Sequence, residues 1–234
     1  MEKTFIHPVI GEIKIRRSLT SRAIRLYVHH QNGISITIPL FVSVNQAESF
    51  VNSKTAWITR ALERQKKRAE KYNLHYRDGY SVKTLNGYVH FSLNNNRVPA
   101  LTGSAFNKTI FYNSDTPRKA VTELFDKAIR KLASDYLPKR AVEIAEKHRF
   151  EYNRIFLKNN LSNWGSCSSK RNINLNIHLI RLPQELCDFI ILHEMCHLKY
   201  RNHGEEFHTL LNSLCDGREK EFNKILKEYA PRLI

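Results

Sequence analysis

The sequence contains no run of 18 apolar residues, so it predicts no membrane-spanning helix. Its first residues, MEKTFIHPVI, lack the charged and then apolar pattern of a secretory signal. Cysteine is scarce, with 4 residues in 234 and no CxxC pair, and a chain with 41% hydrophobic residues can bury a core without disulfide staples. These absences together predict a soluble, cytoplasmic protein with reduced thiols.

Acidic residues are also few, with 22 Asp and Glu against 38 Lys and Arg, a formal net charge of +16. Residues 1–79 hold 14 Lys and Arg and 6 Asp and Glu, so this third of the chain carries half of the excess. The densest basic run comprises Arg64, Lys66, Lys67, Arg68 and Lys71. Such a run is most often a solvated helix face, although it can also follow a nucleic-acid backbone. No RNA-binding or zinc-finger motif accompanies it, so nucleic acid is only a candidate partner of the basic N-terminal part.

The first seventy residues predict a hairpin covered by a helix. Alternating residues indicate strands at Glu12 to Arg16 and Ala23 to His30, and a turn at Asn32-Gly33 leads into the β-branched run ISITIP. Residues 43–46, SVNQ, have the spacing of a capping box, and apolar residues then recur at helical intervals. Trp57 is predicted to anchor this long amphipathic helix in the core.

Short apolar runs return between Asp78 and Asn113, namely VKTL, YVHFSL and TIFY, and they predict further antiparallel strands. Helical periodicity follows from Thr116-Pro117, where Thr116 is expected to cap the helix. No internal repeat is visible. We therefore expect an α+β protein with a β-rich basic domain over residues 1–115, containing one long helix, and a second domain over residues 116–234.

The second half predicts a helix interrupted or kinked at Pro138, and then two strands. The strands lie around Arg154 to Lys158 and Asn172 to His178, on either side of the loop NNLSNWGSCSSK. A further helix is expected after Pro183. If the segment NINLNIHL lies at a sheet edge, its free backbone groups could pair with an extended peptide.

The most informative segment is HEMCHLKYRNH, residues 193–203. On a helix, His193 and His197 project from one face one turn apart, so two neutral imidazoles can reach one metal ion. Glu194 lies beside them, where it can take a proton from metal-bound water rather than act as a ligand. The pattern predicts a zinc hydrolase.

A third ligand requires the helix to end. At 1.5 Å per residue, a continuous helix would place the Cα of His203 roughly 15 Å beyond that of His193, too far for one ion. The helix should therefore stop soon after His197, with Asn202 or Gly204 in a left-handed turn, so that His203 folds back as the third ligand. The fourth position would remain for water, as a catalytic zinc site requires.

Other residues near the motif remain alternatives. His208 is close enough in sequence to replace the third histidine, and Glu219 or Glu221 could complete a set of two histidines and one glutamate. A donor is also needed to stabilise the oxyanion of an attacked carbonyl. Tyr200, Tyr229 and His208 are candidates, and their spacing does not choose among them.

Several segments, taken in order, resemble those of a known family. They are Trp164 to Ser168 (WGSCS), Ile173 to Asn176, Pro183, and His193 to Phe207. They resemble the YgjP-like metallopeptidase family, also called the domain of unknown function 45 family, in the zincin group. The match covers nearly the whole chain, and its C-terminal motifs are the more specific.

The resemblance implies a zincin-like catalytic domain with a small sheet, in which His193, His197 and His203 bind zinc and Glu194 is the catalytic base. The segment NHGEEF is also similar to that of the SprT-like metalloproteases, where the histidine before Gly is the third ligand. Family members often have Arg before WGSC and Trp after the later Phe, whereas this chain has Asn163 and His208. Substrate preference is therefore not carried over.

These observations predict a Zn²⁺-dependent metallopeptidase that acts on a peptide or protein. Two alternatives stay open. The same site could hydrolyse another bond, such as a nucleotide phosphoanhydride, or the chain could be a non-catalytic nucleic-acid-binding module with structural zinc.

Overall fold

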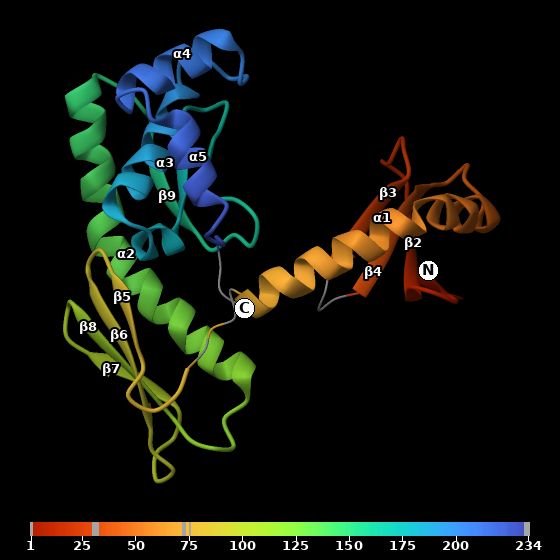
Figure 1. The fold of residues 1–234 in the computed structure, drawn as a ribbon, viewed down its shortest axis with the longest axis horizontal. Helices are drawn as coiled ribbons and strands as arrows, with labels where there is room; N and C mark the ends of the chain where they lie inside the picture. Colours follow the sequence, from red (N-terminus) through yellow and green to blue (C-terminus); the bar gives the residue numbers. More distant parts are fainter. Residues whose placement is uncertain (1, 30–32, 72–73, 75, 232–234) are drawn as a thin grey trace. The chain divides into compact units, whose positions relative to one another are not determined.

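The computed structural model describes residues 2–29, 33–71, 74 and 76–231, which form a mixed α+β protein with several small sheets (Figure 1). The chain divides into two compact units, Met1–Asn73 and Leu74–Ile234. Each unit has its own hydrophobic core. In the described part of the chain, no helix combines the length and the apolar character needed to cross a bilayer.

The first unit is a four-stranded sheet followed by one long helix. Its elements are β1 (Glu2–His7), β2 (Gly11–Ser18), β3 (Arg25–His29), β4 (Gly33–Pro39) and α1 (Val44–Lys71). The strand order is β1-β2-β4-β3, in which β2 and β4 are parallel and the other neighbours antiparallel. The predicted β3–β4 hairpin is confirmed, whereas β1 was not predicted. Asn32 of the predicted turn lies outside the described residues.

The core of this unit joins one face of the sheet to one side of α1. Its buried side chains are Ile13, Ile15, Ile34, Ile36, Ile38, Ala47, Val51 and Ile58. The predicted covering helix is therefore confirmed, but the role predicted for Trp57 is wrong, because its side chain is 47% exposed. Ile58 is fully buried, and the residue before it projects about 100° away around the helix.

The capping box at the start of α1 is confirmed. The Ser43 backbone N–H donates to Gln46 Oε1 at 2.8 Å, and the Gln46 N–H donates to Ser43 Oγ at 3.2 Å. Of the basic run further along α1, Arg64, Lys66 and Lys67 are exposed, while the side chains of Arg68 and Lys71 lie outside the described residues. A nucleic-acid contact through this run stays a prediction.

Replacing Ser43 by alanine is expected to loosen the first turn of α1. A lost N-cap costs about 1 kcal/mol, so amide exchange in this turn should become roughly fivefold faster, as measured by hydrogen exchange. Ser53→Ala is the matched control, because the Ser53 hydroxyl only donates to the Phe50 carbonyl within the helix. Equal exchange rates in the two variants would contradict a stabilising role for the cap.

The second unit begins with a sheet of the same topology. Its elements are β5 (Ser81–Thr84), β6 (Gly87–Leu93), β7 (Ala100–Gly103), β8 (Asn107–Tyr112) and the long helix α2 (Arg118–His148). The strand order β5-β6-β8-β7 repeats that of the first sheet, again with a parallel central pair, here β6 and β8. The expected antiparallel pairing is therefore confirmed for β5 with β6 and for β7 with β8, but it is wrong for β6 with β8. The sequence shows no visible repeat that would have predicted this shared strand order.

The predicted domain boundary near residue 115 falls inside this unit, because the sheet packs on α2. Phe91 of β6 stacks on Phe125 of α2 with ring centroids 5.9 Å apart, and both belong to the core of residues 74–234. The helix begins at Arg118, and Thr116 does not cap it, since its hydroxyl bonds to Asn113. It runs through Pro138 as a single helix that bends partway along its length (Figure 1).

The remaining elements are β9 (Ile155–Lys158), β10 (Gly165–Cys167), β11 (Ile173–Asn176), the 3₁₀ helix η1 (Ile177–Arg181), α3 (Gln184–Cys196), α4 (Glu205–Leu214) and α5 (Glu219–Leu226). The three strands form a sheet of order β10-β11-β9. The condition that NINLNIHL lies at a sheet edge is not met, because β11 is the central strand and the residues after it form η1. The edge strands are β9 and β10, and β10 lies within the segment predicted as a loop.

Candidate metal centre

Helix α3 carries the first part of the motif and is held firmly in the core. It starts after Pro183, whose carbonyl accepts the N–H groups of Leu186 and Cys187, each at 3.1 Å. Arg140 of α2 donates two hydrogen bonds of 2.8 Å to the carboxylate of Asp188 on α3. This bidentate ion pair anchors the first half of α3, and the buried face of the helix continues to Cys196, where the motif lies.

The helix ends where the metal hypothesis requires, but not by the predicted turn. Its last residue is Cys196, with His197 as the C-cap, and the Tyr200 N–H donates back to the Cys196 carbonyl at 2.9 Å. Neither Asn202 nor Gly204 is left-handed. Gly204 is instead extended and serves as the N-cap of α4. The chain therefore reverses through a tight right-handed turn followed by an extended residue.

This reversal brings the three histidines of the motif together. One ring nitrogen from each of His193, His197 and His203 lies within 4.8 Å of the others. The Nε2 atoms of His193 and His203 are 3.1 Å apart. Two nitrogen ligands of one tetrahedral zinc ion lie about 3.3 Å apart, given Zn–N bonds of about 2.0–2.1 Å. The three imidazoles thus fit a zinc ion, and they are the only such group among the described residues.

Two neighbours orient these rings. His197 Nδ1 lies 3.0 Å from the carbonyl oxygen of Tyr200, so Nδ1 carries the proton and Nε2 presents its lone pair. Phe207, fully buried, packs against all three imidazoles with ring centroids 4.6–4.9 Å away. Neither role was predicted from the sequence. The one signal for the role of Phe207 was its position on the first turn of the helix that follows the third histidine.

The environment of the cluster favours neutral imidazoles, the form that binds metals. Burial first, and then the neighbouring histidines, lower the pKa of His193 to about 4. The pKa of His203 is also lowered, by burial first and then by His197 and His208. The rings of His193 and His203 can therefore accept a cation without first losing a proton near neutral pH.

Glu194 follows His193 on α3 and is not part of the three-histidine group. Its side chain is buried, with 6% of the residue exposed, and burial raises its pKa to about 8. It packs against β10, where a Cβ added to Gly165 would lie 2.6–2.9 Å from three atoms of its side chain. The carboxylate is thus held by a strand rather than exposed to solvent.

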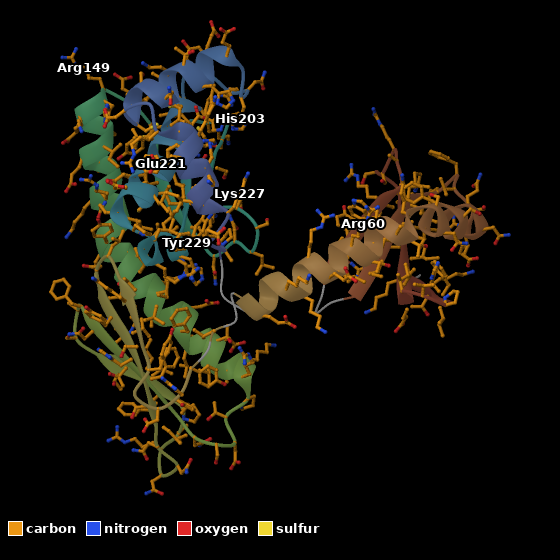
Figure 2. All side chains as sticks on the ribbon, in the orientation of Figure 1. Arg60, Arg149, His203, Glu221, Lys227 and Tyr229 are labelled. Atoms are coloured by element: carbon orange, nitrogen blue, oxygen red, sulfur yellow. The ribbon has the colours of Figure 1, made fainter. Side chains whose placement is uncertain are left out.

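The alternative ligands are engaged elsewhere. Glu219 Oε1 lies 2.7 Å from His208 Nδ1, and Glu221 pairs with Arg218. Figure 2 labels Glu221 and Tyr229 apart from His203. The ring of His208 is nearer, with its centroid 6.3 Å from that of His203. None of these residues belongs to the three-histidine group.

The loop before β10 is fastened to β11 by one buried side chain. The Asn176 amide donates to the carbonyls of Asn160 and Asn163, each at 2.9 Å, and its own backbone N–H donates to the Trp164 carbonyl. The antiparallel pairing alternates, so the backbone groups of Gly165 and Cys167 point to the open side of β10. The Asn163 side-chain amide donates a hydrogen bond of 3.0 Å to the Gly165 carbonyl.

Comparison with known proteins identifies a family. No curated protein matches this chain. Two solved structures are similar over part of it: the metallopeptidase zymogen abylysin of Pyrococcus abyssi (17% identity, 42% of this chain and 97% of that one, TM-score 0.36) and the metallopeptidase zymogen jannalysin of Methanocaldococcus jannaschii (28% identity, 38% and 95%, TM-score 0.32). A family model described as the YgjP-like metallopeptidase domain matches residues 22–229. The chain therefore belongs to the YgjP-like metallopeptidase domain family.

Proposed function

We propose that this protein is a zinc-dependent peptidase with His193, His197 and His203 as metal ligands and Glu194 as the general base. The observation that carries the proposal is the convergence of three imidazole nitrogens, and a buried glutamate directly follows the first of these histidines on α3. Three protein ligands with a fourth position open are typical of catalytic rather than structural zinc. Membership of a metallopeptidase family supports the same assignment.

Zinc, when bound, would supply Lewis acidity and lower the pKa of a coordinated water to about 7. The chain's own groups handle the protons. Glu194 accepts the proton of the attacking water and passes it to the leaving amine, and its apolar surroundings suit a base that must also act as an acid. Tyr200 contributes its backbone carbonyl, which holds His197 in the tautomer that a ligand needs.

Of the three candidate oxyanion donors, His208 is best placed. Its Nδ1 lies 2.7 Å from the Glu219 carboxylate, which fixes the ring, and Nε2 would donate to an oxyanion when both ring nitrogens carry a proton. Glu219 is almost fully buried, so the pair is anchored from the protein side. The Tyr200 ring packs against the hydrophobic core, and Tyr229 is labelled away from His203 in Figure 2.

The peptide substrate is proposed to bind along β10. An extended peptide can add to a free strand edge through backbone hydrogen bonds, and Gly165 and Cys167 present such groups beside Glu194. The Asn163 side chain would have to leave the Gly165 carbonyl to complete that pairing. This role replaces the one predicted for the NINLNIHL segment.

The test is hydrolysis by the purified protein of an unbiased peptide mixture, followed by mass spectrometry, with nucleoside triphosphates assayed in parallel. We expect cleavage of peptide bonds that a chelator abolishes and added zinc restores. Hydrolysis of the nucleotides alone would favour phosphoanhydride chemistry. Absence of turnover on every substrate, with zinc bound, would favour a binding module.

A further inference from the structure

Gly165 differs from the other closely packed glycines of the chain. Gly87 and Gly103 have left-handed backbones (φ 115° and 117°), and an added Cβ would strike main-chain atoms of Phe106 and Asn107. Those positions need glycine for backbone reasons. Gly165 has no such φ, and it lies in a regular strand that any residue can adopt.

The obstacle at Gly165 is one side chain. The three atoms nearest to an added Cβ are Cγ, Oε1 and Cδ of Glu194, at 2.6, 2.7 and 2.9 Å. Real Cβ contacts are not this short, so an alanine at position 165 and the present Glu194 conformation exclude each other. The atoms that would have to move belong to the flexible end of a side chain, and the fold itself need not change.

We propose that Gly165 is a positioning residue, whose missing side chain forms the slot that holds the Glu194 carboxylate beside the histidine cluster. The inference rests on the proposed function of Glu194 as the base. It explains why a glycine occupies the first position of the edge strand although the backbone does not require one. A methyl group there would push the carboxylate out of the position that it now holds against β10.

Displacement of the base has a specific kinetic signature. A misplacement of about 1 Å can lower turnover roughly 100-fold. None of the three atoms nearest to an added Cβ at Gly165 belongs to an imidazole. Gly165→Ala is therefore expected to lower kcat about 100-fold for a cleaved peptide, with zinc content unchanged and KM little affected. An unchanged kcat would overturn the proposal.

A stability cycle tests the slot without any assay of activity. Gly165→Ala should lower Tm in the wild-type background, because Glu194 is forced out of its site. In a Glu194→Ala background the space is empty, and the same change should raise Tm by about 1–4 °C, since alanine restricts the unfolded chain at a position whose backbone accepts it. The sign of the shift thus depends on the residue at position 194.

Ser166→Ala is the control, since Ser166 lies on the same strand and is exposed. It should shift Tm equally in both backgrounds. Equal shifts for Gly165→Ala in the two backgrounds would overturn the slot. If the wild-type protein cleaves no peptide, the proposed function fails, and the Tm cycle still decides whether Gly165 holds Glu194.

Discussion

Glutamine in place of Glu194 is expected to leave zinc bound and to lower peptide hydrolysis by about 10²- to 10⁴-fold, the usual contribution of general acid–base catalysis. The amide has the same shape as the carboxyl group but cannot accept the proton. Zinc content and peptide turnover, measured on the same preparation, check this result. Unchanged turnover would remove Glu194 from the mechanism.

The same variant should be more stable than the wild type when zinc is removed. Burial raises the pKa of Glu194 from an ordinary value of 4.5 to about 8, so the folded state disfavours its ionisation. The stability of the folded wild type is then complete below about pH 4.5 and declines as the pH rises towards 8. At pH 8 the difference amounts to about 3–5 kcal/mol, at 1.36 kcal/mol for each pKa unit. Glutamine does not titrate and avoids this loss.

Denaturant unfolding of the chelated proteins between pH 5 and pH 8 measures this effect. The two stability curves should nearly meet at the acidic end and separate as the pH rises. Glu206→Gln, an exposed glutamate in the first turn of α4, is the control and should change stability by no more than about 0.5 kcal/mol. Parallel curves for wild type and Glu194→Gln would show that Glu194 is not buried as described.

Alanine in place of His203 is expected to abolish tight zinc binding with little cost to the metal-free fold. His203 is exposed, so its removal leaves no cavity. For the wild type, zinc at 100 times its Kd should add about 2.7 kcal/mol of stability, and for a chain of this size that raises Tm by roughly 5–10 °C. His203→Ala should lose this increase.

The matched control is His208→Ala, which removes the neighbouring histidine that was the alternative ligand. It should retain the zinc-dependent rise in Tm, because His208 faces Glu219 and lies outside the three-histidine group. Thermal unfolding with and without zinc compares the variants. If His208→Ala lost the zinc-dependent rise in Tm and His203→Ala kept it, the third ligand would be His208 rather than His203.

Features set by local chemistry were predictable from the sequence. The capping box of Ser43 and Gln46 and the helix after Pro183 depend on residues within one turn of each other. The distance argument for His203 likewise used only helix geometry, and the structure ends α3 at the required place. The way in which it ends was missed, because a right-handed turn at His197 and a left-handed one at Gly204 have similar sequence signals.

Features set by contacts between distant segments were not predictable. The order β10-β11-β9 depends on which strands meet, and nothing within NINLNIHL distinguishes a central strand from an edge. In the chain, β7 lies between β6 and β8, but in the sheet it lies beyond β8. This placement, which the sequence does not indicate, lets β6 and β8 meet as a parallel pair. The slot at Gly165 needs the packing of α3 on β10, two elements whose sequences carry no mark of the contact. Trp57 is a smaller example. Helical periodicity located the apolar face of α1 but did not show that Trp57 lies outside the buried part of that face.

The separate cores of the two units bear on the order in which the chain matures during synthesis. Every residue of the first core lies before position 63, including those packed at its margin, so that unit can fold as soon as it leaves the ribosome. The core beneath the histidines instead draws on segments from Leu74 to Phe222. The histidine cluster of the proposed metal centre can therefore take its final place only after the residues up to Phe222 have been synthesised.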